Sequence, residues 1–269
     1  MKTWEDPVGG RFGLVVTRTE EHGATVRLPG SAFNRHDGQW RLSSCLAAVD
    51  VAGGVSTGLA AFPQWTLTAD IELHRVPAPV AGPIDVVGRL VKHGRRLSLA
   101  RVTLGHPGSA TPMALGHVNH VMTTPPFAPA FSALPIGGVL ALTGGATDDA
   151  TPAEAFGLVH AEGREGRRAV RIECDDSTSN FYGVLHGAMT GVMVEEIAAR
   201  EGIRVDDVAI RFLRSVAKGP ATAEVVDRLT RGEREVLCIE VVGGEESAVA
   251  TRVTVSGVRT EEGAAITHG

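Results

Sequence analysis

An internal repeat constrains the fold of this chain more than any other feature. Short segments of the first half recur in the same order in the second half, offset by 144 residues near the start of each copy and by 137 residues farther along. The matched segments are Phe12-Gly13-Leu14-Val15 with Phe156-Gly157-Leu158-Val159, Val26-Arg27-Leu28 with Val170-Arg171-Ile172, Asp70 with Asp207, and Gly82-Pro83 with Gly219-Pro220. Two copies whose landmarks keep their order while the loops change length indicate two homologous domains rather than a solenoid.

Both copies predict the same order of elements: two strands, one long helix, and then a series of four strands. Helical spacing of apolar residues indicates helices over 43–61 and 187–201, and alternating β-branched residues indicate the strands. The expected strands are 13–19, 24–28, 66–74, 84–92, 98–104 and 113–122 in the first copy, and 158–162, 169–174, 207–213, 221–229, 236–242 and 247–255 in the second. The pattern therefore divides the chain into an N-terminal domain (1–122), a proline-rich linker (123–145), a C-terminal domain (146–258) and a flexible tail (259–269).

Three glycines, Gly53, Gly54 and Gly58, fall inside the first predicted helix. Each costs a helix about 1 kcal/mol relative to alanine, so their presence needs a reason. Close packing of the helix against a sheet is one reason, and close approach of a ligand to the helix backbone is the other.

Composition excludes several classes of function. A chain of 269 residues suits two domains of about 130 residues, and 43% hydrophobic residues indicate a globular protein. The formal net charge of −5 argues against a general binder of nucleic acid or of anionic membranes. The three cysteines, Cys45, Cys174 and Cys238, are odd in number and form no CxxC pair, which is typical of a reducing compartment.

Targeting signals are not visible in the sequence. The first ten residues, MKTWEDPVGG, contain no apolar core of a secretory signal. The longest apolar-rich stretch, 45–62, is interrupted by Asp50 and several glycines, so we do not expect it to span a membrane. We expect a cytoplasmic protein.

The second copy contains the most specific motif, NFYGVLHGAMTGVMVEEIA, from Asn180 to Ala198. Asn180 lies six residues before His186-Gly187, and Glu195 lies nine residues after His186. This spacing resembles the motif of the phenylacetate-type hotdog acyl-CoA thioesterases, within the 4-hydroxybenzoyl-CoA thioesterase-like superfamily. The resemblance covers both copies and implies an α+β double hotdog, with two antiparallel sheets that each wrap round one long central helix.

The first copy retains only part of this motif. Asp50 holds the acid position, but Arg41 and Leu42 stand where the family has its His-Gly pair. Asn34 stands for the asparagine, with one residue of slippage. Thr68 falls where similar enzymes have a serine or threonine on the third strand, and its counterpart in the second copy is Val205.

In this family the active site is built across a two-fold interface, with the Asn and His-Gly from one hotdog and the acid from the other. The resemblance thus implies one complete mixed site, whose catalytic residues are Asp50, Thr68, Asn180, His186 and Gly187. The opposite site would combine Glu195 with Asn34, Arg41, Leu42 and Val205 and lacks both the His-Gly pair and the hydroxyl. We expect it to be a degenerate pseudo-site, in which Arg41 pairs with Glu195.

These residue types suit thioester hydrolysis. A helix N-terminus offers free backbone N–H groups to the oxyanion that forms when the carbonyl is attacked, and Gly187 has no Cβ to keep the thioester away. Asp50 would act as general base or as nucleophile, and the sequence leaves both open. Asn180 would orient the water or the carbonyl, Thr68 would hold the carboxylate or the water, and His186 would orient the loop or bond near the thioester oxygen.

Substrate-binding residues are expected on both sides of the site. Met189, Met193 and Leu46 would line an acyl channel between the helices, and Arg95 and Arg96 on a hairpin would meet the phosphates of CoA, unless they only solvate a turn. His117 and His120 have no cysteine or acid beside them on the strand and point to opposite faces, so we expect no metal. We expect no cofactor other than the CoA thioester substrate, no nucleic-acid or membrane partner, and a homodimer.

Two rival functions remain open from the sequence. A hotdog hydratase or dehydratase would place its histidine about fourteen residues before the acid, and that position holds Phe181. A non-catalytic module that binds acyl thioesters is the other rival, because the first copy has already lost its His-Gly pair.

Overall fold

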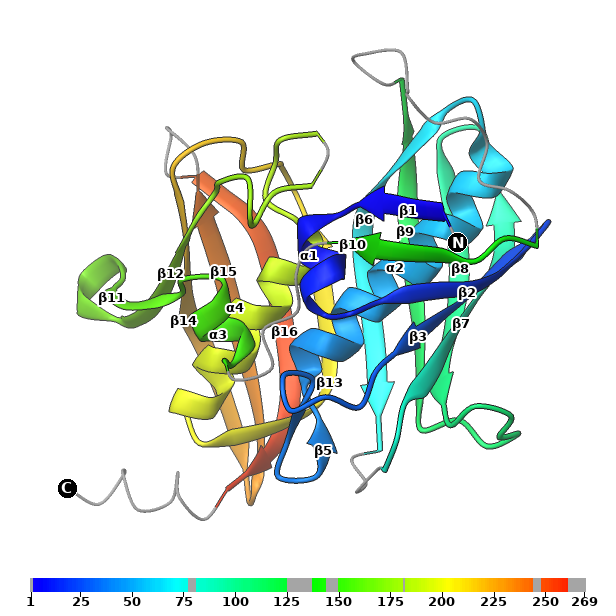
Figure 1. Ribbon diagram of the computed structural model, residues 1–269. Helices are drawn as coiled ribbons and strands as arrows, with labels where there is room; N and C mark the ends of the chain where they lie inside the picture. The colour runs from blue at the N-terminus through cyan, green and yellow to red at the C-terminus, as the bar shows by residue number, and fades with distance from the viewer. Residues whose placement is uncertain are drawn as a thin grey trace.

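The computed structural model describes residues 2–76, 81–124, 137–143, 150–180, 182–243 and 248–260. Each half of the chain contributes one long helix and an antiparallel set of strands, with a short helix before the first long strand (Figure 1). In the first half the elements are β1 (Lys2–Glu5), α1 (Pro7–Arg11), β2 (Val15–Glu20), β3 (Gly23–Leu28), β4 (Arg35–His36), β5 (Gln39–Trp40), α2 (Leu42–Ala61), β6 (Trp65–Arg75), β7 (Ile84–His93), β8 (Leu97–Gly105), β9 (Ala114–Thr123) and β10 (Leu140–Thr143).

The second half repeats this order. Its elements are α3 (Pro152–Ala155), β11 (Val159–Glu162), the short 3-10 helix Arg164–Gly166, β12 (Arg168–Glu173), α4 (Gly187–Arg200), β13 (Ile203–Phe212), β14 (Pro220–Arg231), β15 (Arg234–Gly243) and β16 (Ala248–Arg259). Every helix and strand expected from the sequence is present, with ends that shift by at most four residues. The helix α2 stops at Ala61 because Phe62, which precedes Pro63, takes an extended conformation.

The two halves share one sheet, which corrects the expectation of two separate sheets. The fourteen strands follow the order β1-β10-β2-β3-β7-β8-β9-β6-β13-β16-β15-β14-β12-β11. The join is the antiparallel pair β6–β13, where His74 lies opposite Asp207, Glu72 opposite Ala209 and Asp70 opposite Arg211. This register is symmetric under the 137-residue offset, since residues 70, 72 and 74 correspond to 207, 209 and 211. The repeat thus produces a pseudo-two-fold axis that passes through the Glu72–Ala209 pair.

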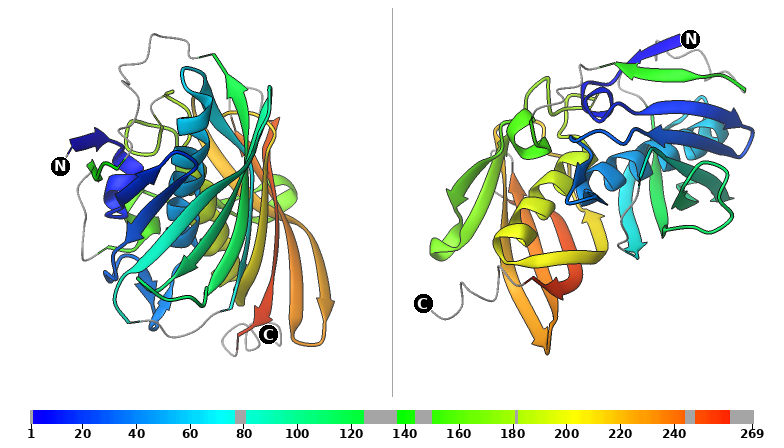
Figure 2. Two further views of the ribbon diagram at one scale, coloured as in Figure 1. Left: turned by 90° about the vertical axis from the view of Figure 1, so that its right-hand side faces the viewer. Right: turned by 60° about the horizontal axis from the view of Figure 1, so that its bottom comes forward.

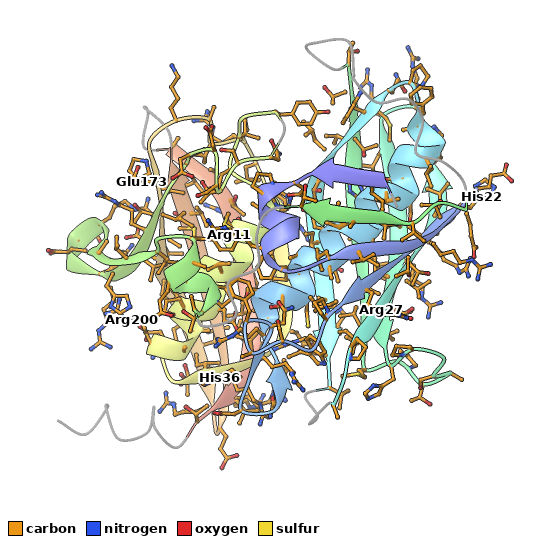
Figure 3. The ribbon with its side chains drawn as sticks, in the orientation of Figure 1. Arg11, His22, Arg27, His36, Glu173 and Arg200 are labelled. Carbon is orange, nitrogen blue, oxygen red and sulfur yellow. The ribbon has the colours of Figure 1, made fainter. Side chains whose placement is uncertain are left out.

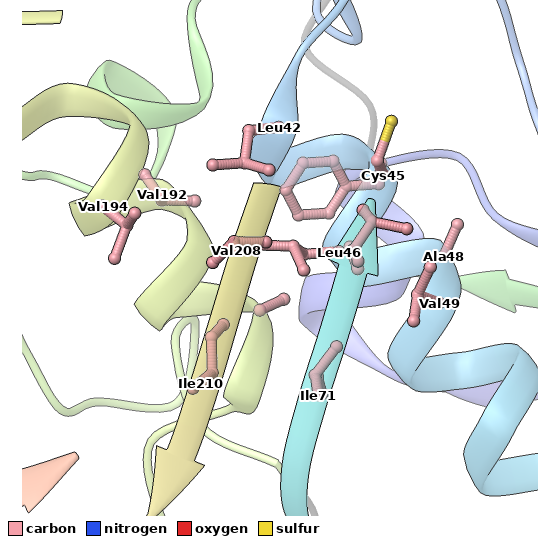
Figure 4. Packing of buried hydrophobic residues seen from close by; sticks show 14 of the residues in the cluster. Leu42, Cys45, Leu46, Ala48, Val49, Ile71, Val192, Val194, Val208 and Ile210 are labelled. Atoms are coloured by element: carbon pink, nitrogen blue, oxygen red, sulfur yellow. The ribbon is translucent and has the colours of Figure 1, made fainter. Parts of the chain in front are cut away.

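The two long helices lie side by side on the concave face of this sheet (Figures 1 and 2). They cross where Leu46 of α2 packs on Gly191 of α4, and a Cβ added to Gly191 would lie 3.0 Å from Leu46 Cδ1. Aliphatic residues of both helices and of β6 and β13 fill the space between them (Figure 4).

The helix α2 is buried on almost every side, which explains why its apolar residues do not form a single stripe. By length and composition it could cross a membrane, with a mean hydropathy of 1.4, but 67% of that window is buried inside the protein. The sheet of the first half wraps around it, so the structure uses it as a core helix, as the sequence predicted.

The short elements before each first strand were not expected from the sequence. Both α1 and α3 begin with a proline at the first turn, and each is capped by a side chain, Asp6 in one and Thr151 in the other. The repeated phenylalanines that follow them, Phe12 and Phe156, pack together with ring centroids 5.8 Å apart. Arg11 lies between the halves (Figure 3), where its guanidinium stacks on Phe156 and donates to the Ala155 carbonyl.

The expected linker and tail need correction where they are described. Leu140–Thr143, inside the expected linker 123–145, is strand β10 and pairs with β1 and β2 at the edge of the first half. Arg259 still belongs to β16, and the Thr260 amide donates to the Gly202 carbonyl. The linker residues 125–136 and 144–145, residues 146–149 of the expected C-terminal domain and the tail residues 261–269 lie outside the described residues.

Candidate active site

The N-terminus of α4 supplies the amide that the sequence predicts for an oxyanion. His186 is the N-cap, and its Nδ1 accepts a hydrogen bond from the Ala188 amide at 3.0 Å. The Gly187 amide, the first of the helix, has no acceptor among the described residues. The positive end of the helix dipole therefore presents one free N–H group.

Asp50 of α2 faces this amide from the other half of the chain. Its Oδ1 accepts a 2.6 Å hydrogen bond from the Thr68 hydroxyl on β6. Its Oδ2 would lie 3.1 Å from a Cβ built on Gly187, so the glycine allows the carboxylate and the helix N-terminus to approach closely. Asp50, Thr68, His186 and Gly187 thus come together although they lie up to 137 residues apart in the sequence.

The His186 ring lies between two carboxylates. Its Nδ1 is 3.9 Å from Asp50 Oδ2, and its Nε2 is 4.0 Å from Asp6 Oδ2. Because Nδ1 accepts from the Ala188 amide, a neutral ring carries its proton on Nε2, toward Asp6. Sequence reasoning missed Asp6; the dipeptide Asp6-Pro7, a helix cap followed by proline, was the available signal.

A cavity of about 580 Å³ opens beside these groups. Asp50, Thr68, His186 and Gly187 form one end of it, and Asn180 also lines it. The rest of the wall is mainly apolar and comes from one side of α2, from β6 and from the second half, including residues 184–185 and 212–216. The α2 residues are Val51, Gly54, Val55, Gly58 and Leu59.

Asn180 is fixed by its own loop. Its Oδ1 accepts from the Tyr182 amide at 2.9 Å and, more weakly, from the Val184 amide at 3.4 Å. The side-chain Nδ2 group has no acceptor among the described residues, so it remains available as a donor at the cavity wall.

The three helical glycines separate into two roles. A Cβ on Gly53 would lie 2.9 Å from Val118 Cβ, so this glycine lets α2 pack against β9. Gly54 and Gly58 instead line the cavity, and a Cβ on either would have one neighbouring heavy atom within 4 Å. Close packing therefore explains Gly53, and close approach of a ligand to Gly54 and Gly58 stays a prediction.

The opposite mixed site, at the N-terminus of α2, is blocked by the carboxylate of its own acid, Glu195. Glu195 of α4 accepts from the Leu42 amide at 3.1 Å through Oε1 and from the Ser43 amide at 3.2 Å through Oε2, and the Ser43 hydroxyl donates to Oε2 as well. The carboxylate thus occupies the two amides that begin α2. The expected ion pair with Arg41 does not occur among the described contacts, because these backbone donors bind Glu195 instead.

The remaining pseudo-site residues are structural. Asn34 is 1% exposed and donates through Nδ2 to the carbonyls of Phe12 and Pro29. Arg75, at the end of β6, donates to the backbone carbonyls of Trp40 and of Val205, the last of which belongs to the pseudo-site. A neighbouring cavity bordered by Trp40, Cys45 and Arg75 measures only about 30 Å³, and burial raises the pKa of the Cys45 thiol, which keeps it protonated.

Two groups of expected substrate residues lie elsewhere. Met189 and Met193 are fully buried, and neither they nor Leu46 are among the residues that line the cavity; all three belong to the core between the halves, because the cavity follows the far side of α2. Arg95 and Arg96 are exposed at the β7–β8 turn and also do not line it. Among the described residues, no three His, Cys, Asp or Glu side chains form a group that could hold a metal ion.

Comparison with known proteins gives a match at the level of structure. No protein-family model and no curated protein sequence matches this chain. A tesB protein of Mycobacterium avium subsp. paratuberculosis superposes with a TM-score of 0.60 at 12% identity, over 91% of this chain and 95% of its own. An acyl-ACP thioesterase from Bacteroides thetaiotaomicron gives 0.57 at 11% identity, over 86% and 96%. A protein of unknown function with a hot dog fold from Alicyclobacillus acidocaldarius gives 0.59 at 10% identity, over 94% and 97%.

These similarities extend over almost the full length of each chain and define the fold. The protein has an α+β hotdog fold, in which a large antiparallel sheet wraps round long helices.

Proposed function

We propose that this protein hydrolyses acyl-CoA thioesters to the free acid and CoA at a single site between its two halves. The observation that supports this most directly is the position of the Asp50 carboxylate, which is held by Thr68 and faces the free amide of Gly187 at the end of an apolar cavity. One of the structural neighbours is an acyl-ACP thioesterase, which is consistent with thioester chemistry.

The geometry suggests how the reaction would proceed. The acyl chain would lie along Gly54 and Gly58, with the thioester carbonyl oxygen directed at the Gly187 amide. Asp50 would take a proton from a water molecule as its oxygen bonds to the carbonyl carbon, and the oxyanion would accept from Gly187 N–H. The carbon–sulfur bond then breaks and the proton returns to the CoA thiolate. The alternative is direct attack by Asp50 Oδ2, which forms an anhydride that water then hydrolyses.

His186 would act by keeping the helix N-terminus open. Its imidazole satisfies the second amide of α4, so that amide does not draw in the Asp50 carboxylate, and the first amide stays free for the substrate. Thr68 would contribute by holding Asp50 Oδ1, which leaves Oδ2 for chemistry.

A thiol-release assay over a panel of acyl-CoA and acyl-carrier-protein thioesters tests the proposal. Release of CoA that depends on Asp50 supports it. Addition of water to enoyl-CoA without thiol release would support a hydratase, and tight binding without turnover would support a binding module. A single turnover in ¹⁸O-water tests for direct attack: an unlabelled first product shows an anhydride that water opened at the Asp50 carbonyl carbon, which transfers the Asp50 oxygen to the acid.

We also propose that the protein is cytoplasmic and that it forms a homodimer. Light scattering of the purified chain would test the homodimer.

A further inference from the structure

A histidine that the proposed reaction does not use is buried beside the cavity. His120 of β9 is 1% exposed, and neither ring nitrogen has a hydrogen-bond partner among the described residues. Ser98, which lies opposite His120 in the register of β8 and β9, is already bonded to His93 at 2.8 Å. An imidazole without partners is costly to bury, so its presence needs an explanation.

The ring faces the same wall of α2 that lines the cavity. His120 lies opposite Thr68 in the register of β6 and β9, which puts both side chains on the concave face. Its Cε1 is 3.4 Å from a Cβ built on Gly53, and its Nε2 is 3.7 Å from one built on Gly54. Apart from the backbone of α2 itself, no other heavy atom of the described residues lies within 4 Å of that Gly54 position, and both Gly54 and His120 line the cavity.

The distance from the catalytic end is short. Gly54 follows Asp50 by one helical turn, a rise of about 6 Å along the axis. An acyl chain whose carbonyl carbon sits at Asp50 would pass Nε2 with about its third to fifth carbons, the β to δ carbons, counting the carbonyl as the first.

The charge state of the ring favours a neutral partner. Burial lowers the pKa of His120 to about 4, although the Asp50 charge acts in the opposite direction. A neutral imidazole has one donor and one acceptor nitrogen, which suits a hydroxyl or a keto oxygen.

The second half lacks this feature. In the register of β13 and β16, Gly257 lies opposite Val205, just as His120 lies opposite Thr68. A Cβ on Gly257 would lie 2.1 Å from the Arg204 carbonyl oxygen, so that position cannot hold any side chain. The hydroxyl and the imidazole therefore occur together only in the half whose mixed site is open.

We infer that His120 binds an oxygen substituent on the acyl chain, so that the preferred substrates are acyl thioesters with a hydroxyl or keto group at the β to δ carbon. This inference rests on the proposed thioesterase function. The substrate oxygen supplies the hydrogen-bond partner that His120 lacks within the protein, and an unsubstituted chain leaves the ring nitrogens without one.

The test compares matched substrates in the wild-type protein: β-hydroxyacyl-CoA, δ-hydroxyacyl-CoA and the unsubstituted acyl-CoA of equal chain length. We expect kcat/KM for one of the hydroxylated substrates to exceed that of the unsubstituted one by about tenfold. In His120→Leu the ratio should fall to near one. A wild-type ratio at or below one, or a ratio that His120→Leu leaves unchanged, would overturn the inference.

A pair of glycine variants provides a control for cavity shape. Gly54→Ala puts a methyl group 3.7 Å from Nε2 and should lower the ratio, whereas Gly58→Ala narrows the channel one turn away, near Thr66, and should affect both substrates alike. Equal responses to the two variants would count against a role for His120.

Binding of non-hydrolysable thioether analogues separates this inference from the proposed function. If no thioester is hydrolysed but the hydroxylated analogue binds more tightly than the plain one in a His120-dependent way, the thioesterase proposal fails and the recognition stands. If hydrolysis depends on Asp50 but shows no preference for the hydroxylated substrate, the thioesterase proposal stands and the recognition by His120 fails.

Discussion

The two mixed sites of this protein start from the same arrangement and end in opposite states. In each, an acid nine residues after one helix N-cap reaches toward the N-terminus of the other helix. Glu195 reaches it and binds the first two amides of α2. Asp50 is held back by Thr68, and the first amide of α4 stays free beside a cavity of about 580 Å³.

Side-chain length and capping account for the difference. Glutamate is one methylene longer than aspartate, so it can span the gap between the helices. On the α4 side, His186 caps its own helix, whereas Arg41, the N-cap of α2, makes no side-chain cap bond. A helix end that is left uncapped recruits the nearest carboxylate, and a capped one leaves that carboxylate available for chemistry.

The largest effects are expected when the charge of each acid is removed in turn. Asp50→Asn keeps an acceptor for Thr68 but removes the base, and turnover should fall by about 10²–10⁴-fold in the thiol-release assay. Glu195→Gln should keep most of the activity but lower the free energy of unfolding by about 1–2 kcal/mol, measured by urea denaturation, because the cap of α2 is weakened. If Glu195→Gln abolished turnover and Asp50→Asn did not, the assignment of the two sites would be reversed.

The free amide can be tested at Gly187. Gly187→Ala puts a methyl group 3.1 Å from Asp50 Oδ2 and 3.3 Å from Phe212, so either the carboxylate or the thioester must move. We expect kcat to fall by about 10–100-fold with a much smaller change in melting temperature. An unchanged kcat would show that Gly187 is not where the oxyanion binds.

Side-chain length is tested by Asp50→Glu, which retains the charge. The longer carboxylate should reach the Gly187 amide and close the open site as Glu195 closes the other, with a loss of roughly tenfold or more in kcat/KM. The melting temperature should hold or rise, because α4 gains a cap. Full activity in this variant would mean that length does not distinguish the two sites.

The roles assigned to the three glycines of α2 can be tested through the stability of their alanine variants. Gly53→Ala should destabilise the protein by about 1–3 kcal/mol, because its methyl group would lie 2.9 Å from Val118. Gly54→Ala and Gly58→Ala should each stabilise it by about 0.5–1 kcal/mol while narrowing the cavity. Calorimetry of the three variants would contradict the assigned roles if all three changed stability in the same direction.

The last test uses pH and reports on stability alone. His120 has a folded pKa of about 4, below the unfolded value of about 6.5, so the unfolded chain binds its proton first and stability falls as the pH drops through this window. The loss from this group approaches about 3 kcal/mol near pH 4, and Asp50 is the charged group that opposes it. Denaturation of His120→Leu between pH 7 and pH 4 should show a flatter acid limb, and an identical slope in both proteins would contradict this.

Much of this molecule was determined by local sequence. The strands and both long helices follow from periodic apolar residues, and the repeat predicts that the halves correspond. The motif of Asn180, His186 and Glu195 predicted a helix that begins at Gly187, where α4 does begin, and the offset between copies identified Val205 as the counterpart of Thr68. These predictions succeed because each depends on residues within one element or on a comparison between two copies.

Tertiary structure alone decided the rest. Only the pairing of β6 with β13 fuses the halves into one sheet, and only the packing distances separate Gly53 from Gly54 and Gly58. The roles of Glu195 as a cap and of His120 as an unpartnered ring depend on groups from elements far apart in the chain. No local pattern records those distances, because whether a polar group is satisfied is set by the neighbours that folding brings to it.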